Sequence, residues 1–261
     1  MNFNSVQDGK IDVVYPLASI SKGPDDLELR YSLRSLEGQA WVRNVFTIGY
    51  RPQWLKNAHH IDFPDPWNYN FKDKNIIKKM LRACVDDRVS DPFVANSDDQ
   101  YWLKPVRPED MMIPPRENPA QIDLDRTSKT KGPFRAWRNM WVKRQYETVE
   151  YLRKRGKATI CFDGHVPYIV EKAKYLRTMN DIPWEMGNGF LIVVYHGYNW
   201  ENGFHIEDRD GVLKRIKSDC SCKMVEEAIG NALFLNHNNR GLGQGMREFL
   251  EKRFPNPSRW E

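Results

Sequence analysis

Short apolar runs alternate with an amphipathic stretch along the first part of the chain. Residues 11–15 and 42–48 are rich in β-branched and aromatic side chains, as buried strands are. Between them, residues 29–36 repeat apolar side chains at helical spacing. A strand, a helix and a strand in this order predict a βαβ unit with parallel strands. A further apolar run at residues 93–95 predicts another buried strand.

The pattern changes after residue 103. Six prolines fall within residues 104–133, and because proline lacks an amide proton and clashes with the preceding turn, long helices are excluded there. We predict a long loop that acts as a lid or an acceptor platform. Beyond it, the pattern predicts helices at about 134–155, 168–179, 223–235 and 244–252, and strands at 158–162 and 189–195.

Two adjacent carboxylates, Asp98 and Asp99, follow the strand predicted at residues 93–95. In open α/β sheets ligands bind beyond the carboxyl ends of the strands, and paired carboxylates there hold Mg²⁺ or Mn²⁺ against the phosphates of a nucleotide. We therefore predict that Asp98 and Asp99 are metal ligands and that Asp99 takes part in catalysis. The alternative is that the pair caps a helix or fills a solvated turn.

Several short motifs resemble those of the Stealth family, which includes capsular polysaccharide phosphotransferases and the GlcNAc-1-phosphotransferase of lysosomal enzyme tagging. The resemblance extends over nearly the whole chain. The matching segments are residues 12–15, 29–35, 52–55, 97–99, 165–167, 177–182 and 253–261. The resemblance implies a GT-A-like sheet that binds a nucleotide-sugar donor and a divalent metal, and it implies that Arg177 contacts phosphate or the acceptor.

Two more residues are assigned to the donor. Arg34 carries a planar guanidinium that can hold a phosphate by two parallel hydrogen bonds, although a surface charge on a helix is the alternative. Asp12, in the first predicted strand, is also placed at the donor site.

The chain departs from the family at two places. Residues 17–21 stand where the family has a W-V-D/N-G loop, and the late L-N-D segment reads Leu235-Asn236-His237. The chemistry is therefore left open between transfer of the sugar to an acceptor hydroxyl, which we favour, and transfer of the sugar-1-phosphate to a polysaccharide or glycan. A noncatalytic nucleic-acid-binding protein on the same fold is a third hypothesis.

Two histidines have a context that indicates chemistry. His165 lies on a predicted turn near Asp163, and we predict that it is the general base that deprotonates the acceptor hydroxyl. His237 follows an apolar run and is predicted to be a third metal ligand or a phosphate contact. The alternatives are a neutral turn histidine at 165 and a capping turn at 237.

Residues 126–157 carry eleven basic residues and two acidic ones, a local charge of +9 in a chain whose net charge is +5. Cations pair with phosphates and aromatic faces stack on bases or sugars, so this segment is typical of a polyanion-binding surface. The predicted acceptor is a nucleic acid with a hydroxylated base, or else a polysaccharide or glycan. The predicted acceptor contacts are Arg135, Arg138, Lys143, Arg144, Trp137 and Trp141. A solvated amphipathic helix is the alternative.

Together these observations predict a single α/β domain over residues 1–261, with a GT-A-like mixed sheet flanked by helices. Residues 1–103 form the nucleotide-sugar half, residues 104–133 the proline-rich loop insertion, and residues 134–261 the acceptor half. A chain of 261 residues that is 40% hydrophobic can bury one sizeable core. No signal-peptide pattern and no apolar run of membrane-spanning length is present, so we expect a cytoplasmic protein without membrane insertion.

Overall fold

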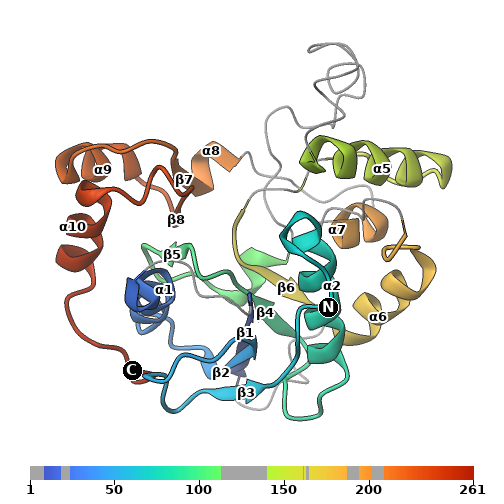
Figure 1. The fold of residues 1–261 in the computed structure, drawn as a ribbon, viewed down its shortest axis with the longest axis horizontal. Helices are drawn as coiled ribbons and strands as arrows, with labels where there is room; N and C mark the ends of the chain where they lie inside the picture. Colours follow the sequence, from blue (N-terminus) through green and yellow to red (C-terminus); the bar gives the residue numbers. More distant parts are fainter. Residues whose placement is uncertain are drawn as a thin grey trace.

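The structure is a computed structural model that describes residues 9–18, 24–112, 140–160, 162, 165–186, 194–200 and 209–261. Two sheets organise these residues. The larger sheet has the strand order β3-β2-β1-β4-β6 and the smaller one β5-β8-β7, and helices surround both (Figure 1). The fold class is therefore mixed α/β, as the sequence predicts.

The larger sheet is parallel except at one edge. β1 (Ile11–Leu17) lies between β2 (Val42–Gly49) and β4 (Phe93–Ala95) and is parallel to both. β3 (His59–Ile61) continues the sheet beyond β2, and β6 (Tyr168–Val170) pairs with β4 in the antiparallel direction. The carboxyl ends of β1, β2 and β4 therefore meet at one edge, and the βαβ prediction is confirmed.

Successive side chains of β1 point to opposite faces of the larger sheet, so the core consists of two layers. Val14 packs with α2 (Lys72–Cys84), α6 (Lys172–Asp181) and α7 (Val194–Asn199) on one face of the sheet. Val13 points to the opposite face of the sheet, together with every second side chain of β1. There it packs with α1 (Leu27–Leu36) and the smaller sheet. A strand whose two faces are both covered reads as a continuous apolar run, which is why β1 is evident in the sequence.

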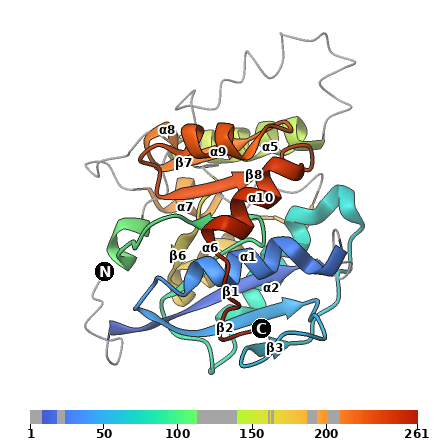
Figure 2. The ribbon, with the colours of Figure 1, turned by 90° about the vertical axis from the view of Figure 1, so that its left-hand side faces the viewer.

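The smaller sheet lies over the face that also carries α1. β5 (Gln100–Trp102) is antiparallel to β8 (Phe234–His237), which is parallel to β7 (Leu213–Ile216). In Figure 2 this sheet and α9 (Cys222–Ile229) lie above the larger sheet, with α10 (Gln244–Arg253) beside them. The remaining elements are α5 (Met140–Lys154), α8 (Arg209–Val212) and the short helices η3 (Pro24–Asp26), η4 (Tyr69–Phe71) and η5 (Pro108–Met111).

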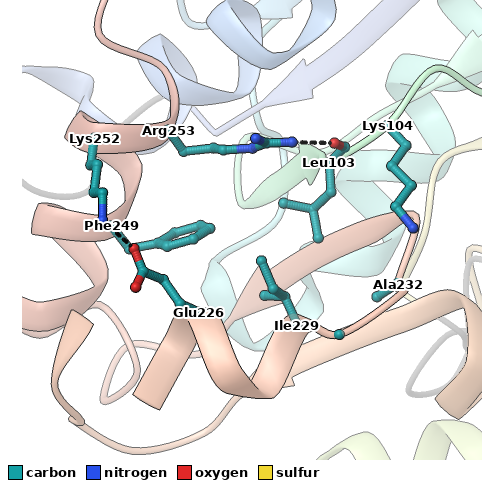
Figure 3. Close-up of a pocket in the computed structure, with 9 residues that line it drawn as sticks. Leu103, Lys104, Glu226, Ile229, Ala232, Phe249, Lys252 and Arg253 are labelled. Atoms are coloured by element: carbon teal, nitrogen blue, oxygen red, sulfur yellow. Dashed lines mark hydrogen bonds and ion pairs between the residues drawn. The ribbon is translucent and has the colours of Figure 1, made fainter. Parts of the chain in front are cut away.

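A pocket of about 310 Å³ lies where α9 and α10 meet the end of β5 (Figure 3). Its cations are already engaged: Lys252 pairs with Glu226 at 2.7 Å, and Arg253 donates to the carbonyl of Leu103 at 2.8 Å. Leu103 follows β5, whereas Asp98 and Asp99 precede it, so the pocket opens at the opposite end of this strand from the carboxylates. Apolar side chains of Leu103, Ile229, Ala232 and Phe249 line the rest.

Two predicted helices contain strands. Tyr168–Val170 forms β6, and the helix begins only at Lys172. The helix predicted at residues 223–235 ends at Ile229, before Gly230, and Phe234–His237 forms β8. In both cases the tertiary pairing with a neighbouring strand overrides a helical apolar spacing, because short apolar runs do not distinguish the two structures.

The structure differs from the two strands predicted at residues 158–162 and 189–195. Among the described residues of the strand predicted at 158–162, which exclude residue 161, Ile160 alone forms a bridge. Val194 and Tyr195, predicted to end a strand, begin α7. Residues 189–193 of that strand lie outside the described residues, as does most of the proline-rich segment.

The helix predicted at 244–252 is confirmed as α10. None of the described helices has the length and apolar character required to cross a lipid bilayer.

Gly49 marks a point of close approach at the carboxyl edge of the larger sheet. Its φ is +101°, and a Cβ atom there would lie 2.6 Å from the carbonyl oxygen of Leu17 and 2.7 Å from Nζ of Lys79. Lys79 is 1% exposed, donates to the Leu17 carbonyl and pairs with Asp65 at 2.5 Å. Burial lowers the pKa of this lysine, while Asp65 opposes that effect.

We predict that Gly49→Ala lowers the free energy of unfolding by about 2–4 kcal/mol, since an unfavourable backbone conformation and an atomic overlap act together. Gly156→Ala is the matched control, because Gly156 also has a positive φ of +64° but open space around its Cβ position. Urea denaturation of both variants gives the comparison. Equal losses in the two variants would show that the contact with Leu17 and Lys79 contributes nothing.

Candidate functional site

The two carboxylates lie in a turn that joins the two sheets. β4 of the larger sheet ends at Ala95, and β5 of the smaller sheet begins at Gln100. The backbone N–H of Gln100 donates to the carbonyl of Ser97 at 3.2 Å, and its side-chain Oε1 accepts from the N–H of Ser97 at 3.0 Å. Asp98 and Asp99 are half-buried inside this closed turn, at the carboxyl end of β4 as predicted.

A chain of buried hydrogen bonds connects the turn to β1 and α1. Asn96 Nδ2 donates to the hydroxyl of Tyr15 at 2.8 Å, which lies 2.9 Å from Ser32 Oγ. Ser32 in turn donates to the carbonyl of Gln100 at 2.7 Å. Burial raises the pKa of Tyr15 well above that of free tyrosine, so its phenol keeps its proton and donates to Ser32. β1, α1 and both ends of the turn are thereby linked.

His237 approaches the turn from β8 but has its ring nitrogens engaged. Nε2 lies 2.8 Å from the hydroxyl of Tyr101, and Nδ1 lies 3.1 Å from the carbonyl oxygen of Asn238. Because a carbonyl only accepts, the proton of the neutral ring is assigned to Nδ1, and Nε2 accepts from Tyr101. Burial lowers the pKa of His237, and the negative charge of Asp99 opposes this effect. Oε1 of Glu28 lies 3.7 Å from Nε2.

His237 is therefore near Asp99 without being assembled with it as a ligand. Among the described residues, no group of three or more His, Cys, Asp or Glu side chains is arranged to hold a metal ion. The oxygen donors at this turn are Asp98 and Asp99. A hard cation accepts such an incomplete set, because substrate phosphates and water commonly supply its remaining ligands. The part of His237 as third ligand stays a prediction.

His165 lies at the same edge of the sheet. Ala95, the last residue of β4, pairs with Tyr168, the first residue of the antiparallel β6. The residues that precede Tyr168 therefore run beside those that follow Ala95, which places His165 on the side of the Asp98 turn. His165 is half-buried and has a φ of +53°, a conformation that is uncommon for a residue with a side chain and is often found at functional sites. Asp163 lies outside the described residues.

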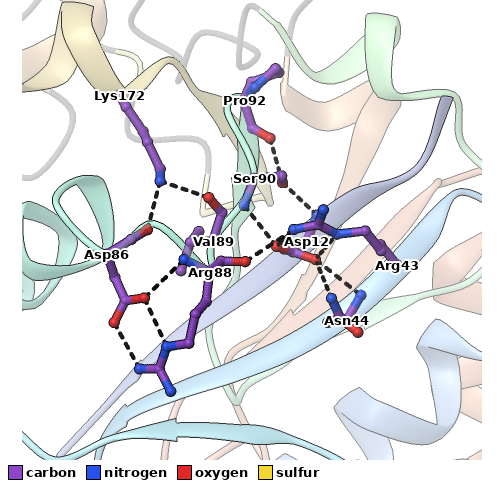
Figure 4. Close-up of polar contacts among 9 residues, drawn as sticks. All are labelled: Asp12, Arg43, Asn44, Asp86, Arg88, Val89, Ser90, Pro92 and Lys172. Atoms are coloured by element: carbon purple, nitrogen blue, oxygen red, sulfur yellow. Dashed lines mark hydrogen bonds and ion pairs between the residues drawn. The ribbon is translucent and has the colours of Figure 1, made fainter. Parts of the chain in front are cut away.

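Asp12 lies at the opposite edge, because its partner in β4 is Phe93, the first residue of that strand. Its carboxylate is fully buried and pairs with Arg43 at 2.5 Å. It also accepts from the backbone N–H groups of Asn44 at 3.1 Å and Ser90 at 2.7 Å (Figure 4). The structure thus gives Asp12 a role in joining β1 to β2 and to the segment before β4, away from the predicted donor site.

Arg34 also has a partner within the protein. Its Nε and Nη2 atoms donate to the two carboxylate oxygens of Glu261 at 2.7 and 2.9 Å, and Arg30 donates to the same group at 3.0 Å. The planar fork predicted to hold a phosphate holds a carboxylate here. This contact fastens the closing segment of the sequence to α1. Arg177 is exposed on α6, where its predicted contact with phosphate or acceptor stays a prediction.

The acceptor prediction requires one correction. Arg144 is 5% exposed, its Nε lies 2.9 Å from Asp73, and it donates to the carbonyl of Asn70 at 3.1 Å. This buried ion pair fastens α5 to α2, so Arg144 is not part of an exposed surface. Arg135, Trp137 and Arg138, and the side chains of Trp141 and Lys143, lie outside the described part. The exposed cations at the end of α5 are Arg153, Lys154, Arg155 and Lys157.

No family model matches the chain, and no curated protein sequence matches it. The residues that the structure brings together are Asp98, Asp99 and His237, with His165 at the same edge. Those that sequence reasoning missed are Tyr15, Ser32 and Gln100, whose burial and pairing carry no signal in a single sequence.

The pairing of Glu261 predicts a pH dependence of stability. Burial alone raises the pKa of this carboxyl, but hydrogen bonds from Arg34, the Ser258 N–H and Arg30 outweigh burial and hold the pKa at about 2, below the usual 4.5. The stabilisation is therefore complete above about pH 4.5 and is lost as the pH falls towards about 2.

We expect Glu261→Gln to lower the free energy of unfolding by about 2 kcal/mol at neutral pH, the scale of a hydrogen bond to a charged group. Its difference from wild type should shrink as the pH falls below 4.5. Urea denaturation across this pH range measures it, with Glu251→Gln, an exposed position on α10, as control. A difference that is independent of pH would contradict the ion pair with Arg34.

Proposed function

We propose that this chain is a metal-dependent transferase that uses a nucleotide-sugar donor. The observation that carries the proposal is the rigid turn at the carboxyl edge of the parallel strands, which holds Asp98 and Asp99 side by side. Ligands of open α/β sheets bind at this edge. Carboxylate oxygens are the ligands that Mg²⁺ and Mn²⁺ prefer, and such a cation bridges naturally to a diphosphate.

The arrangement of the sheets supports a GT-A-like reading of the fold. A mainly parallel sheet ends in an antiparallel β6, and a smaller sheet begins directly after the carboxylate turn. The strand β8, which is the last strand in the sequence of the described residues, brings His237 close to Asp99. The motif resemblance to the Stealth family adds to this reading, since its matched segments include the strand β1, the helix α1 and the turn itself.

The residues at the turn have separate roles in the proposed reaction. Asp98 and Asp99 would hold a divalent cation, which would supply Lewis-acid stabilisation of the charge on the departing phosphate. Tyr15, Ser32 and Asn96 hold the two carboxylates in place. His165 accepts the proton of the acceptor hydroxyl, which leaves the oxygen free to form the new bond as the donor's bond to the departing phosphate breaks.

The acceptor that we propose is a polyanion, with nucleic acid as the first choice. The support is the exposed group of cations at the end of α5, where Arg155 stacks over the ring of Tyr151 at 4.3 Å and Lys157 over that of Tyr198 at 4.8 Å. Cations beside aromatic faces suit a phosphate backbone with stacked bases. A polysaccharide or glycan is the alternative outcome of the test.

The test is incubation with a panel of nucleotide-sugars, Mn²⁺, and either nucleic-acid or glycan acceptors, followed by mass spectrometry of the nucleotide released. Direct glycosyl transfer, which we favour, releases a nucleoside diphosphate. Transfer of the sugar-1-phosphate releases a nucleoside monophosphate. Release of neither nucleotide from any donor would overturn the proposed function.

With the active donor, Asp98→Asn and Asp99→Asn should each lower turnover by about 100-fold or more, because even outer partners of metal ligands contribute about 10- to 100-fold. The melting temperature should change little, since both side chains are half-buried turn residues. Asp87→Asn, an exposed aspartate of another acidic pair, is the control. Full activity of both turn variants in buffer treated with a chelator would refute the metal assignment.

His165→Ala should lower the rate of transfer by about 100-fold or more while leaving the KM for the donor unchanged, because a general base acts on the acceptor. Steady-state kinetics with the donor and the acceptor varied in turn separate the two effects. His59→Ala, at an exposed position on β3, is the matched control. A loss confined to donor affinity would instead assign His165 to the nucleotide.

A further inference from the structure

Three polar side chains form a row across the smaller sheet, at the end that meets the carboxylate turn. Asn236 on β8 pairs with Gln100 on β5 on one side and with Arg215 on β7 on the other. Side chains paired across neighbouring strands point to the same face of a sheet. The next row on this face, Trp102, Phe234 and Leu213, belongs to the core between the two sheets.

The centre of this polar row lacks partners. Asn236 is fully buried, and neither its Oδ1 nor its Nδ2 atom has a hydrogen-bond partner in the described part of the chain. The same holds for Nε of Arg215, and for Oδ1 of Asn96, which directly follows β4 of the facing sheet. Proteins rarely leave buried polar atoms unpaired, and a pair of them on neighbouring residues indicates a group that the protein alone does not supply.

The row is attached to the carboxylate turn. Gln100, its third member, accepts from the N–H of Ser97 at 3.0 Å, so the side chains beside it lie next to the turn that carries Asp98 and Asp99. Arg215 pairs with Asn236, and Asn236 pairs with Gln100, so the row runs from β7 to the residue that closes the turn. A cation and an unpaired amide thus lie close to two carboxylates.

We propose that Arg215 and Asn236 form an oxyanion subsite that holds a phosphate group of the donor beside the Asp98–Asp99 turn. The identity of the ligand rests on the proposed function. The two residues offer what a phosphate requires, because a guanidinium and an amide NH₂ both donate hydrogen bonds to anionic oxygens. Carboxylates alone repel a phosphate, so a positive group on the far side of the turn completes the charge balance.

Calorimetric titration of the full chain with inorganic pyrophosphate tests the subsite, in parallel with Mn²⁺ and with a chelator. We expect binding under both conditions, and Arg215→Gln should weaken it by about tenfold or more in the chelator, where the carboxylates contribute nothing favourable. Lys214→Gln is the matched control, because Lys214 is the adjacent residue on β7 and is exposed. An unchanged Kd in Arg215→Gln, or no binding of pyrophosphate by the wild type at millimolar concentration, overturns the proposal.

Asn236→Leu provides an independent measurement. If the amide is kept for a ligand, a leucine of similar size removes two unpaired polar atoms and should raise the melting temperature while it weakens pyrophosphate binding. A structural asparagine predicts the opposite shift, so a lower melting temperature with unchanged pyrophosphate affinity would overturn the assignment.

The experiments distinguish a failure of this inference from a failure of the proposed function. Pyrophosphate binding that depends on Arg215, in a protein that releases no nucleotide from any donor, supports the subsite and refutes the transferase. Nucleotide release that depends on Asp98 and Asp99, but pyrophosphate binding and KM for the donor that are unaffected by Arg215→Gln, supports the transferase and refutes the subsite.

Discussion

The buried chain of hydrogen bonds from Asn96 through Tyr15 and Ser32 to Gln100 is the constraint on which the candidate site depends. It joins the central strand of the larger sheet, the helix that follows it and the first residue of the smaller sheet. Asn96 Nδ2 also lies 3.3 Å from Ser32 Oγ, and Ser32 Oγ lies 3.4 Å from the carbonyl oxygen of Ser97, so the network connects both ends of the turn to β1 and α1. The turn that carries the two carboxylates is held in place because several buried hydrogen bonds join it to β1 and α1.

The polar groups buried in this protein fall into two kinds. Asp12, Arg34 and Arg144 are paired with charged partners inside the chain, and each fastens two elements together. Asn236 and Arg215 carry buried atoms without partners in the described part and border the carboxylate turn, whereas Trp102, Tyr175 and His196 carry single unpaired atoms elsewhere in the core. Paired groups contribute to the fold, whereas unpaired ones lower stability unless a ligand satisfies them. Asn236 and Arg215 differ from the other residues with unpaired atoms because they are paired neighbours in one sheet and lie beside the turn.

Sequence reasoning succeeded where the local pattern and the packing agree. β1, α1, β2 and β4 were predicted because a doubly covered strand is apolar throughout and an amphipathic helix has a regular spacing. It failed at β6 and β8, which have only three and four residues, because their strand structure depends on pairing with β4 in one case and with β5 and β7 in the other. The position of Asp98 and Asp99 after a strand was predictable for the same reason that β4 was.

The sequence by itself determined the mixed α/β class, the parallel βαβ start and the place of the two carboxylates at a strand end, because these follow from residues adjacent in the chain. Only the tertiary structure decided which partners the charged side chains take. Arg34 meets Glu261 across 227 positions, and Asp12 meets Ser90 across 78. A guanidinium binds a carboxylate and a phosphate by the same geometry, so its partner is set by which group the fold brings within reach.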